Sequence, residues 1–209
     1  MLKIAVITDE SLKKELLLQS AASDIYIEWL TEPQAVNDVD ACIDLLYEPA
    51  TKRIHLLQQL TAVPVIINDV PGSPEHLPEN FIRINGWKSF LQRPVTEAAA
   101  RNDHFYFQAE QLFAALGKKM NRVPDIPGLV TARVVSMIIN EAWLTFEEGV
   151  STKEEIDKAM KLGTSYPYGP FEWGNIIGLK NVYALLLKLA ASNNRFTPSA
   201  WLKNEAQKA

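Results

Sequence analysis

The sequence has few of the residues from which disulfides, metal sites and phosphate-binding turns are built. Cys42 is the single cysteine among 209 residues, which excludes a disulfide framework and predicts a reducing, cytoplasmic compartment. The histidines, His55, His76 and His104, lie far apart and lack the spacing of metal ligands. No glycine precedes Gly72, so the first third of the chain has no glycine-rich turn. We expect Cys42 to be a small buried hydrophobe and the protein to have no metal site.

The chain also lacks a long apolar run and a surplus of one charge. Its net charge is -4 at pH 7 with dispersed basic residues, which predicts neither a nucleic-acid partner nor an anionic membrane. The apolar run IAVI near the start is too short for a signal peptide or a membrane span. With 47% hydrophobic residues, the chain can bury one large core or two modest ones. We therefore expect a soluble cytoplasmic protein.

Strand-like and helix-like patterns alternate in the first half of the chain. The expected strands are 3–7, 24–30, 41–46, 63–67, 81–84 and 119–123, and the expected helices are 11–21, 50–60 and 103–116. Alternation of this kind favours a mostly parallel sheet with helices packed on its faces. We place the end of this α/β domain at Pro124, because the pattern beyond it is helical throughout.

The second half predicts a helical domain over 125–209. Apolar residues recur at three- and four-residue intervals from Val130 to Leu144, as in a helix that buries one face. Ser151 is the predicted N-cap of the following helix, with Glu154 placed to complete a capping box. The next segment, TSYPYGPFEWG, is predicted to form a bend, because its prolines and glycines restrict the path of the backbone.

Three segments in this half, PDIPGLVTARVVSMIINEAWLTFEEGV, EEIDKAMKLG and YPYGPFEW, closely resemble the start of the C-terminal domain of L-3-hydroxyacyl-CoA dehydrogenases. The resemblance implies that 125–209 is this dimerisation domain and that the chain forms a homodimer through it. It also implies that 1–124 is a reduced Rossmann-like domain, the NAD-binding domain of the family. Three large apolar residues of the second half support a buried interface: Trp143, Trp173 and Trp201. Ancestry alone does not establish an activity, because function lies in the site.

The turn after the first strand departs from the NAD-binding pattern of the family. In the family, glycines let the backbone approach the pyrophosphate at a helix N-terminus. Here the turn is TDESLK, without glycine, and Asp9 and Glu10 add negative charge beside an anionic ligand. Glu28 or Trp29 stands near the ribose-binding position. We expect no cofactor to bind in the family's manner, and NAD only if the chain is an active dehydrogenase.

The catalytic positions of the family are changed as well. Asn85 stands where the family has its histidine base, and Glu97 keeps the place of the carboxylate that orients this histidine. An asparagine amide does not titrate near neutral pH and cannot accept the hydroxyl proton as hydride leaves. Ala132 replaces the asparagine that hydrogen-bonds the substrate. Glu97 is therefore the one placed candidate for a base, with an exposed carboxylate at a helix start as the structural alternative.

Two further positions are candidates for substrate binding. Glu48, with Lys52 or Arg53, lies in a segment that resembles a strand ending in Glu followed by a helix with Lys. Asn68 falls on the S-N-T-S-S turn of the family, but the residues that follow it are DVP and carry no hydroxyl. A loop charge and an exposed helix charge are the structural alternatives for the first segment.

Three functions remain open on this evidence. In the first, the chain is a catalytically degenerate family member that acts as a dimeric binding or partner subunit, with an acyl-CoA or other small molecule as ligand. Alternatively, it is an active oxidoreductase on a 3-hydroxyacyl-CoA or a related small hydroxy acid in fatty-acid metabolism. The third alternative is a structural protein whose own side chains fill the cleft. The three differ in whether NAD binds, a ligand binds without NAD, or neither binds.

Overall fold

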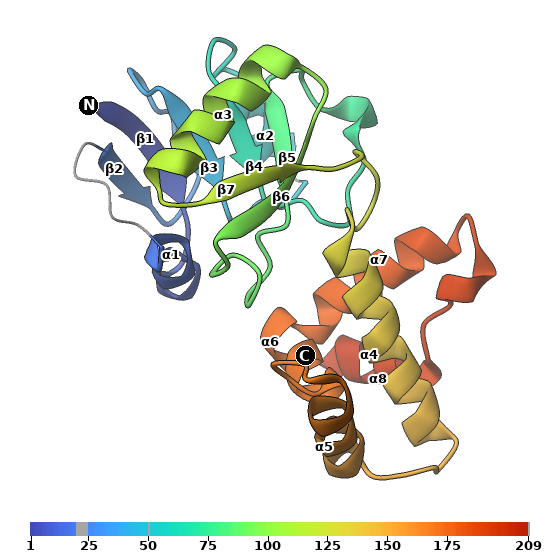
Figure 1. The fold of residues 1–209 in the computed structure, drawn as a ribbon. Helices are drawn as coiled ribbons and strands as arrows, with labels where there is room; N and C mark the ends of the chain where they lie inside the picture. The colour runs from blue at the N-terminus through green and yellow to red at the C-terminus, as the bar shows by residue number, and fades with distance from the viewer. Residues whose placement is uncertain (20–24, 50, 209) are drawn as a thin grey trace. The chain divides into compact units, whose positions relative to one another are not determined.

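The structure, a computed structural model, describes residues 1–19, 25–49 and 51–208 (Figure 1). The chain divides into two compact units, Met1–Leu129 and Val130–Ala209. As predicted, an α/β unit with a mostly parallel sheet precedes an all-helical unit. The division lies after Leu129 rather than Pro124. The backbone N–H of Gly128 donates to the carbonyl of Val70 at 2.8 Å, which ties the intervening residues to the α/β unit.

One seven-stranded sheet forms the centre of the α/β unit, in the order β2-β1-β3-β4-β5-β6-β7. Its strands are β1 (Leu2–Ile7), β2 (Ile25–Leu30), β3 (Ala41–Asp44), β4 (Val65–Ile67), β5 (Phe81–Ile84), β6 (Val95–Ala100) and β7 (Lys119–Arg122). Its helices are α1 (Glu10–Leu17), α2 (Thr51–Leu57), η1 (Pro74–His76) and α3 (Asp103–Ala115). All neighbouring strands are parallel except β5 and β6, which are antiparallel.

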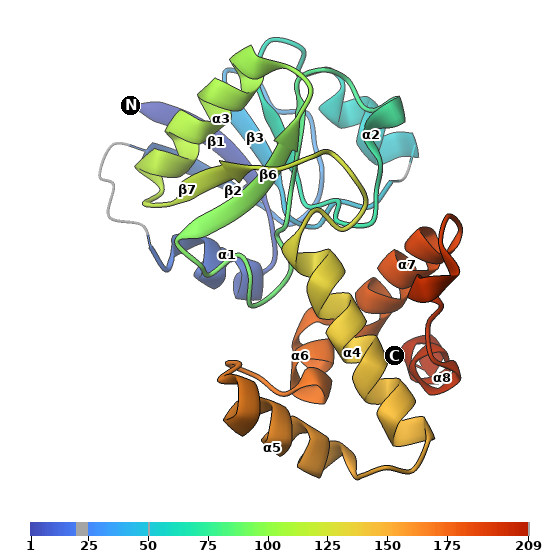
Figure 2. The ribbon, with the colours of Figure 1, turned by 45° about the vertical axis from the view of Figure 1, so that its right-hand side comes forward.

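Both faces of this sheet are covered (Figure 2). On one face, β-strand residues pack with Leu16 of α1 and Phe113 of α3. On the other face, Val65 and Ile67 pack with Leu57 of α2. Burial on both faces explains why residues 4–7 of β1, 41–43 of β3 and 65–67 of β4 are continuous apolar runs instead of alternating ones. Residues 31–40 connect β2 to β3 without a helix, so this connection is shorter than the one in a full strand-helix-strand unit.

Strand β6, with the sequence VTEAAA, was not predicted from the sequence. Alanine has a low preference for strands, and glutamate does as well. Here Ala98 and Ala99 are fully buried, and Ala98 lies in the core cluster that includes α3, so tertiary packing decides the conformation. The expectation that Glu97 lies at a helix start is therefore wrong, because Glu97 lies within β6. The predicted helix 11–21 ends earlier, at Leu17, and its positions 20 and 21 lie outside the described residues.

The helical unit is built around α4. Its elements are α4 (Thr131–Glu147), α5 (Lys153–Thr164), α6 (Pro170–Ile177), α7 (Leu179–Ala190), η2 (Asn194–Phe196) and α8 (Ala200–Lys208). Helix α4 contacts each of α5, α6, α7 and α8. Trp143 and Trp173 are buried in this unit, whereas Trp201 is 49% exposed. Among the described residues, none of the helices combines the length and the apolar character that a bilayer span requires.

The capping box at the start of α5 lies one residue later than predicted. Thr152, not Ser151, is the N-cap, and its hydroxyl accepts from the Glu155 N–H at 3.3 Å. The Glu155 carboxylate in turn accepts from the Thr152 N–H at 3.4 Å and from the Ser151 hydroxyl at 2.6 Å. Two adjacent hydroxyl residues, each followed three positions later by a glutamate, make both registers available to the sequence.

Candidate functional site

The candidate site in the α/β unit is the edge at which the parallel strands end. Strands β2, β1, β3, β4 and β5 run parallel, and the strand order reverses between β1 and β3. In open α/β sheets, ligands bind outside the carboxyl ends of the strands at such a reversal. Asp9, Glu48, Asn68 and Asn85 each follow one of these strands, so the fold brings the sequence-predicted positions to one edge.

The N-terminus of α1, which follows β1, is already occupied by a carboxylate. Asp9 is the N-cap, and its side chain accepts a hydrogen bond from the Leu12 N–H at 2.8 Å. Glu10 in the first turn is 3.5 Å from Lys13, whose ammonium lies 4.7 Å from the ring centre of Trp29. The helix N-terminus is where a bound pyrophosphate needs free N–H donors. These residues do not fit a pyrophosphate, because Asp9 places its own negative charge on a donor.

A buried ion pair stands at the end of β3. Arg53 of α2 donates two hydrogen bonds of 2.6 Å to the carboxylate of Asp44, which is fully buried. Asp44 also accepts from the Leu46 N–H at 3.1 Å. Burial raises the pKa of Asp44, and the Arg53 guanidinium opposes that rise. Sequence reasoning named Arg53 as a substrate-binding candidate, but the structure directs it to Asp44, while Glu48 and Lys52 are exposed.

Asn68 connects the loops after three strands. Its amide nitrogen donates to the Leu45 carbonyl at 3.1 Å, and its amide oxygen accepts from the Gly86 N–H at 3.0 Å. A side chain at Gly86 would meet Asn68 at about 3 Å, which accounts for glycine at that position. Both polar groups of Asn68 therefore have protein partners, and this arrangement supports the shape of the strand edge more directly than it supports substrate binding.

Asn85 and Glu97 are direct neighbours in the sheet. Ile84 pairs with Ala98 across the antiparallel β5–β6 pair, so Asn85 stands opposite Glu97 and their side chains lie on one face. The Asn85 N–H donates to the Glu97 carbonyl oxygen at 3.1 Å. Asn85 is 3% exposed, and its amide oxygen accepts a long hydrogen bond of 3.4 Å from the Trp87 N–H. Within the described residues, its amide nitrogen has no hydrogen-bond partner.

Buried Arg83 on β5 is a residue that sequence reasoning missed. It is 1% exposed, donates to the carbonyls of Asp69 and Val70, and pairs with Asp125 at 2.5 Å. An arginine inside the strand pattern FIRI was the available signal, because a buried guanidinium requires several acceptors. Arg83 thereby holds the segment that leads to the end of this unit.

The remaining predicted positions do not add a catalytic group. Ala132 belongs to the helical unit, where it is fully buried on α4. Cys42 is fully buried, and burial raises its pKa to about 12, so this thiol is not a nucleophile near neutral pH. His55, His76 and His104 are exposed. In the part of the chain that the structure describes, no three histidine, cysteine, aspartate or glutamate side chains cluster in a way that could hold a metal ion.

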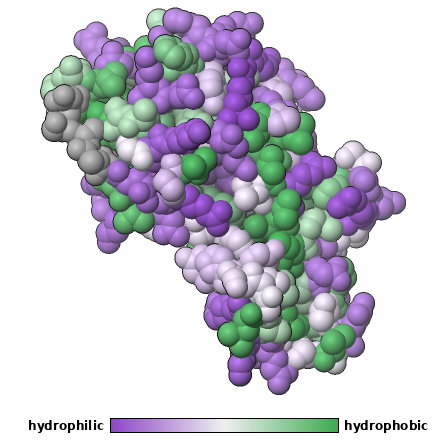
Figure 3. Space-filling view, viewed as in Figure 1, coloured by the Kyte–Doolittle hydropathy of each residue, from purple (hydrophilic) through white to green (hydrophobic). Residues whose placement is uncertain are grey.

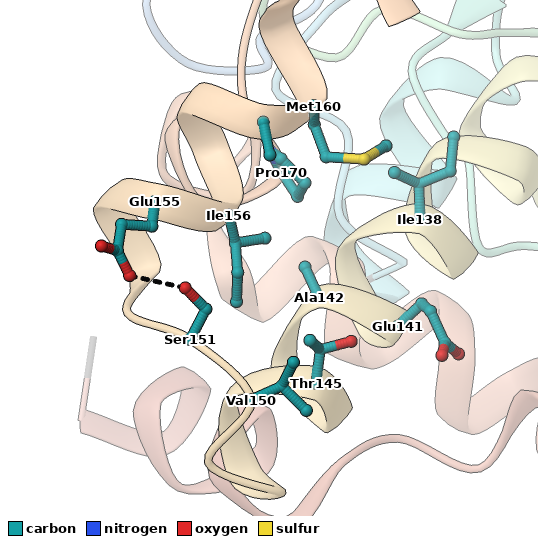
Figure 4. A pocket seen from close by; sticks show the side chains of 11 residues that line it. Ile138, Glu141, Ala142, Thr145, Val150, Ser151, Glu155, Ile156, Met160 and Pro170 are labelled. Atoms are coloured by element: carbon teal, nitrogen blue, oxygen red, sulfur yellow. Dashed lines mark hydrogen bonds between the residues drawn. The ribbon is translucent and has the colours of Figure 1, made fainter. Parts of the chain in front are cut away.

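The helical unit carries an apolar cavity of about 410 Å³ between α4 and α5 (Figure 4). Ile138 and Ala142 of α4 face Ile156 and Met160 of α5 across it, and Pro170 closes one side. Polar groups stand around it: Glu141, Thr145, Ser151 and Glu155. A second cavity of about 490 Å³ shares Ile138 and Glu141 with the first and extends toward η2.

Residues 128–208 match the family model described as 3-hydroxyacyl-CoA dehydrogenase, C-terminal domain. The chain is 36% identical over 112 residues to a 3-hydroxyadipyl-CoA dehydrogenase of Escherichia coli, and the aligned region covers 53% of this chain and 22% of that protein. It is 30% identical over 145 residues to a 3-hydroxybutyryl-CoA dehydrogenase of Bradyrhizobium diazoefficiens, which covers 63% of this chain and 50% of that protein. The chain thus spans half or less of the length of these curated relatives.

The fold as a whole is similar to that of solved dehydrogenases. A crystal structure of (S)-3-hydroxybutyryl-CoA dehydrogenase from Ralstonia eutropha matches with a TM-score of 0.77 at 19% sequence identity, covering 99% of this chain and 93% of that chain. A crystal structure of 3-hydroxybutyryl-CoA dehydrogenase from Escherichia coli K12 also has a TM-score of 0.77, at 18% identity, and covers 97% of this chain and 56% of that chain. At these identities the likeness concerns the fold.

Proposed function

We propose a function on the premise that this chain is a 3-hydroxyacyl-CoA dehydrogenase-like protein, whose residues 128–208 match the C-terminal domain of that family. It is a catalytically degenerate member that acts as a dimeric binding or partner subunit. Its ligand is an acyl-CoA or another small molecule held without NAD, and its partner is a second copy of the chain.

The observation that carries this proposal is the pair Asn85 and Glu97. The two residues are cross-strand neighbours, which supports the interpretation that they stand at the positions of the family's base and its orienting carboxylate. Dehydrogenation requires a group that accepts the hydroxyl proton as hydride leaves. The Asn85 amide binds through hydrogen bonds but accepts no proton near neutral pH. The pair can orient a ligand, and it lacks the group that would make the ligand react.

The α1 N-terminus supports a function without NAD. Asp9 caps the helix with its own carboxylate at 2.8 Å from the Leu12 nitrogen. A pyrophosphate would have to displace this carboxylate and would then remain close to it. At ~5 Å and an effective dielectric constant of ~20, the repulsion between two unit charges is roughly 3 kcal/mol.

Calorimetric titration of the purified chain with NADH, and then with acetoacetyl-CoA, tests the proposal. We expect no heat from NADH and saturable binding of the CoA ester. Micromolar binding of NADH would contradict the degenerate function. Silence from both compounds would favour the structural alternative, in which the chain has no small ligand.

An active oxidoreductase remains the second candidate. Glu97 is a half-buried carboxylate beside Asn85, at the edge of the sheet where the parallel strands end. In that case Glu97 accepts the proton. If any turnover of acetoacetyl-CoA with NADH is found, Glu97→Gln should abolish it while the melting temperature stays within a few degrees. Turnover that survives this substitution would remove Glu97 from the reaction.

A further inference from the structure

Two cavities of the helical unit adjoin along one side of α4. The cavity of about 490 Å³ extends toward η2, the cavity of about 410 Å³ lies between α4 and α5, and both are lined by Ile138 and Glu141. Positions 134, 138, 141 and 145 share one side of the helix, because they follow at intervals of four, three and four residues. Figure 3 shows apolar side chains gathered along α4, in the view of Figure 1. The two cavities together are called the α4 groove below.

The end of the α4 groove near η2 is basic. Arg133 of α4 and Arg195 of η2 line it, and their guanidinium groups lie 4.7 and 5.0 Å from the ring centre of Phe196. Phe196 is buried, so its ring is a fixed support for both charges. Arg195 is exposed, and in the part of the chain that the structure describes no carboxylate pairs with its guanidinium. A guanidinium presents paired N–H donors that match the two oxygens of a carboxylate.

The rest of the α4 groove is mostly apolar. Beyond the two arginines, Val134 and Met137 lead to Ile138, and the cavity between α4 and α5 continues from there with Ala142 and Met160 (Figure 4). From position 133 to position 145 the helix axis rises by about 18 Å. An extended alkyl chain of about fourteen carbons has this length, at ~1.3 Å per carbon for C–C bonds of ~1.5 Å. The groove thus fits a long alkyl chain with a carboxylate at its η2 end.

Two acidic residues of the groove set the direction of such a ligand. Glu141 is exposed and lies eight positions after Arg133, about 12 Å along the axis. Since Coulomb energy falls with distance, a guanidinium at ~4 Å attracts a carboxylate about three times as strongly as Glu141 repels it at ~12 Å. Glu155, which accepts from the Ser151 hydroxyl at 2.6 Å, lines the cavity between α4 and α5. A carboxylate is therefore favoured at the arginine end and disfavoured at the other.

We propose that the α4 groove binds a long-chain carboxylate, the anion of a fatty acid. Its carboxylate lies at Arg133 and Arg195, and its alkyl chain follows α4 into the cavity between α4 and α5. The inference goes beyond the proposed function, because the groove lies wholly within the helical unit and uses neither Asn85 nor Glu97. Burial of the chain supplies affinity, and the arginines supply the choice of head group.

The first test is calorimetric titration of the full chain with three probes. We expect tetradecanoate to bind once per chain with a Kd of about 10 µM. Octanoate, which has six fewer methylenes, should bind at least about a hundredfold more weakly, because each buried methylene tightens binding roughly threefold. Tetradecyltrimethylammonium has the same chain and the opposite charge, and it should bind at least about tenfold more weakly. Equal binding of the two fourteen-carbon probes would overturn the proposed site.

The second test removes one charge from the head-group end. Arg195→Gln and Lys203→Gln each remove a positive charge from an exposed position of the helical unit, but Lys203 lines neither cavity. We expect Arg195→Gln to raise the Kd of tetradecanoate by about tenfold and Lys203→Gln to leave it within about twofold. Equal effects of the two substitutions would overturn the role of the arginines.

The third test places a charge on the path of the alkyl chain. Val150 lines the cavity between α4 and α5 and is 67% exposed, whereas Leu162 is 76% exposed and lines neither cavity. We expect Val150→Asp to raise the Kd of tetradecanoate by about tenfold, because the chain then meets a charged group, and Leu162→Asp to have no effect. If Val150→Asp binds tetradecanoate as the wild type does, the chain does not enter this cavity and the proposal is wrong.

Titration with acetoacetyl-CoA separates this site from the proposed function. A chain that binds acetoacetyl-CoA but not tetradecanoate would overturn the fatty-acid site and leave the proposed function standing. A chain that binds tetradecanoate but not acetoacetyl-CoA, with the responses expected of Arg195→Gln and Val150→Asp, would support the site in the α4 groove and contradict an acyl-CoA as the ligand of the α/β unit.

Discussion

The two units of this protein differ in what their family-like residues do. In the helical unit, residues of the matching segments hold the structure together: Asp157 accepts from the N–H groups of Phe171 and Glu172 at 2.8 and 3.0 Å. Asn140 joins α4 to the segment before α8 through bonds of 3.0 and 2.8 Å. In the α/β unit, the positions that resemble a catalytic site have other residues. In the helical unit, the strong resemblance therefore falls on residues that hold the helices together. In the α/β unit, the resemblance is weaker, and the prediction from it is that Asn85 takes the place of the base.

The bend YPYGPFEW shows why particular residue types are needed in the helical unit. Gly169 is the N-cap of α6, and a side chain there would meet the Asp157 carboxylate at about 2.2 Å. Pro170 occupies the first turn, where its missing N–H is not needed. Glu172 accepts from the Gly169 N–H at 3.0 Å and pairs with Lys161 at 2.6 Å. Each residue has a structural reason that is independent of any reaction.

The largest expected effect concerns the α/β unit. Arg53→Met leaves the fully buried Asp44 carboxylate without its cation, and we expect a loss of about 3–5 kcal/mol of unfolding free energy. Urea unfolding followed by circular dichroism measures this loss. Lys52→Met, at the exposed neighbouring position, is the control and should change stability little. Similar losses for both variants would mean that the ion pair does not support this strand edge.

A slightly smaller effect is expected in the helical unit. Asp157→Ala removes two hydrogen bonds from a charged acceptor at the N-terminus of α6, which we expect to cost about 2–4 kcal/mol. Glu154→Ala, on an exposed position of the same helix, is the control for the lost charge. If Asp157→Ala unfolds no more easily than Glu154→Ala, the comparison between the units fails, because the family-like residue would not be structural.

The buried Lys118 of the α/β unit is expected to make the stability of the protein depend on pH. Lys118 is 2% exposed and donates to the carbonyls of Leu91 and Arg93, and burial lowers its pKa to about 8. Between this pKa and the ordinary value near 10.5, the unfolded chain binds more protons than the folded chain. Stability should therefore rise with pH from about 8 to 10, by up to roughly 3 kcal/mol, relative to a Lys118→Met variant. A constant difference between the two proteins would contradict the shifted pKa.

The smallest expected effect sharpens the contrast in chemistry. Asn85→His returns an imidazole to the position beside Glu97, but Asp9 still caps the α1 N-terminus and Ala132 still lacks a polar group. We expect no NADH oxidation with acetoacetyl-CoA in this variant. Turnover after this single substitution would show that the base was the only missing part, and the α/β unit would then retain a cofactor site.

The sequence by itself determined the class of the fold and the helical half, and the resemblance predicted which positions correspond to the catalytic residues of the family. Apolar runs and helical periodicity are local patterns, so the strands from β1 to β5 and helices α3 and α4 could be predicted from the residues that form them. The prediction that Asn85 and Ala132 stand at the positions of the family's histidine and asparagine likewise rests on residue identity, which needs no coordinates.

Only the tertiary structure decided where polar groups find their partners. Strand β6 forms because its alanines pack in the core, although alanine favours strands poorly. The sequence could not show that Arg53 turns to Asp44, that Asn68 joins three loops, or that Arg83 is buried with Asp125. A buried polar group takes the partner that folding brings within hydrogen-bond distance, and partners distant along the chain leave no periodic pattern.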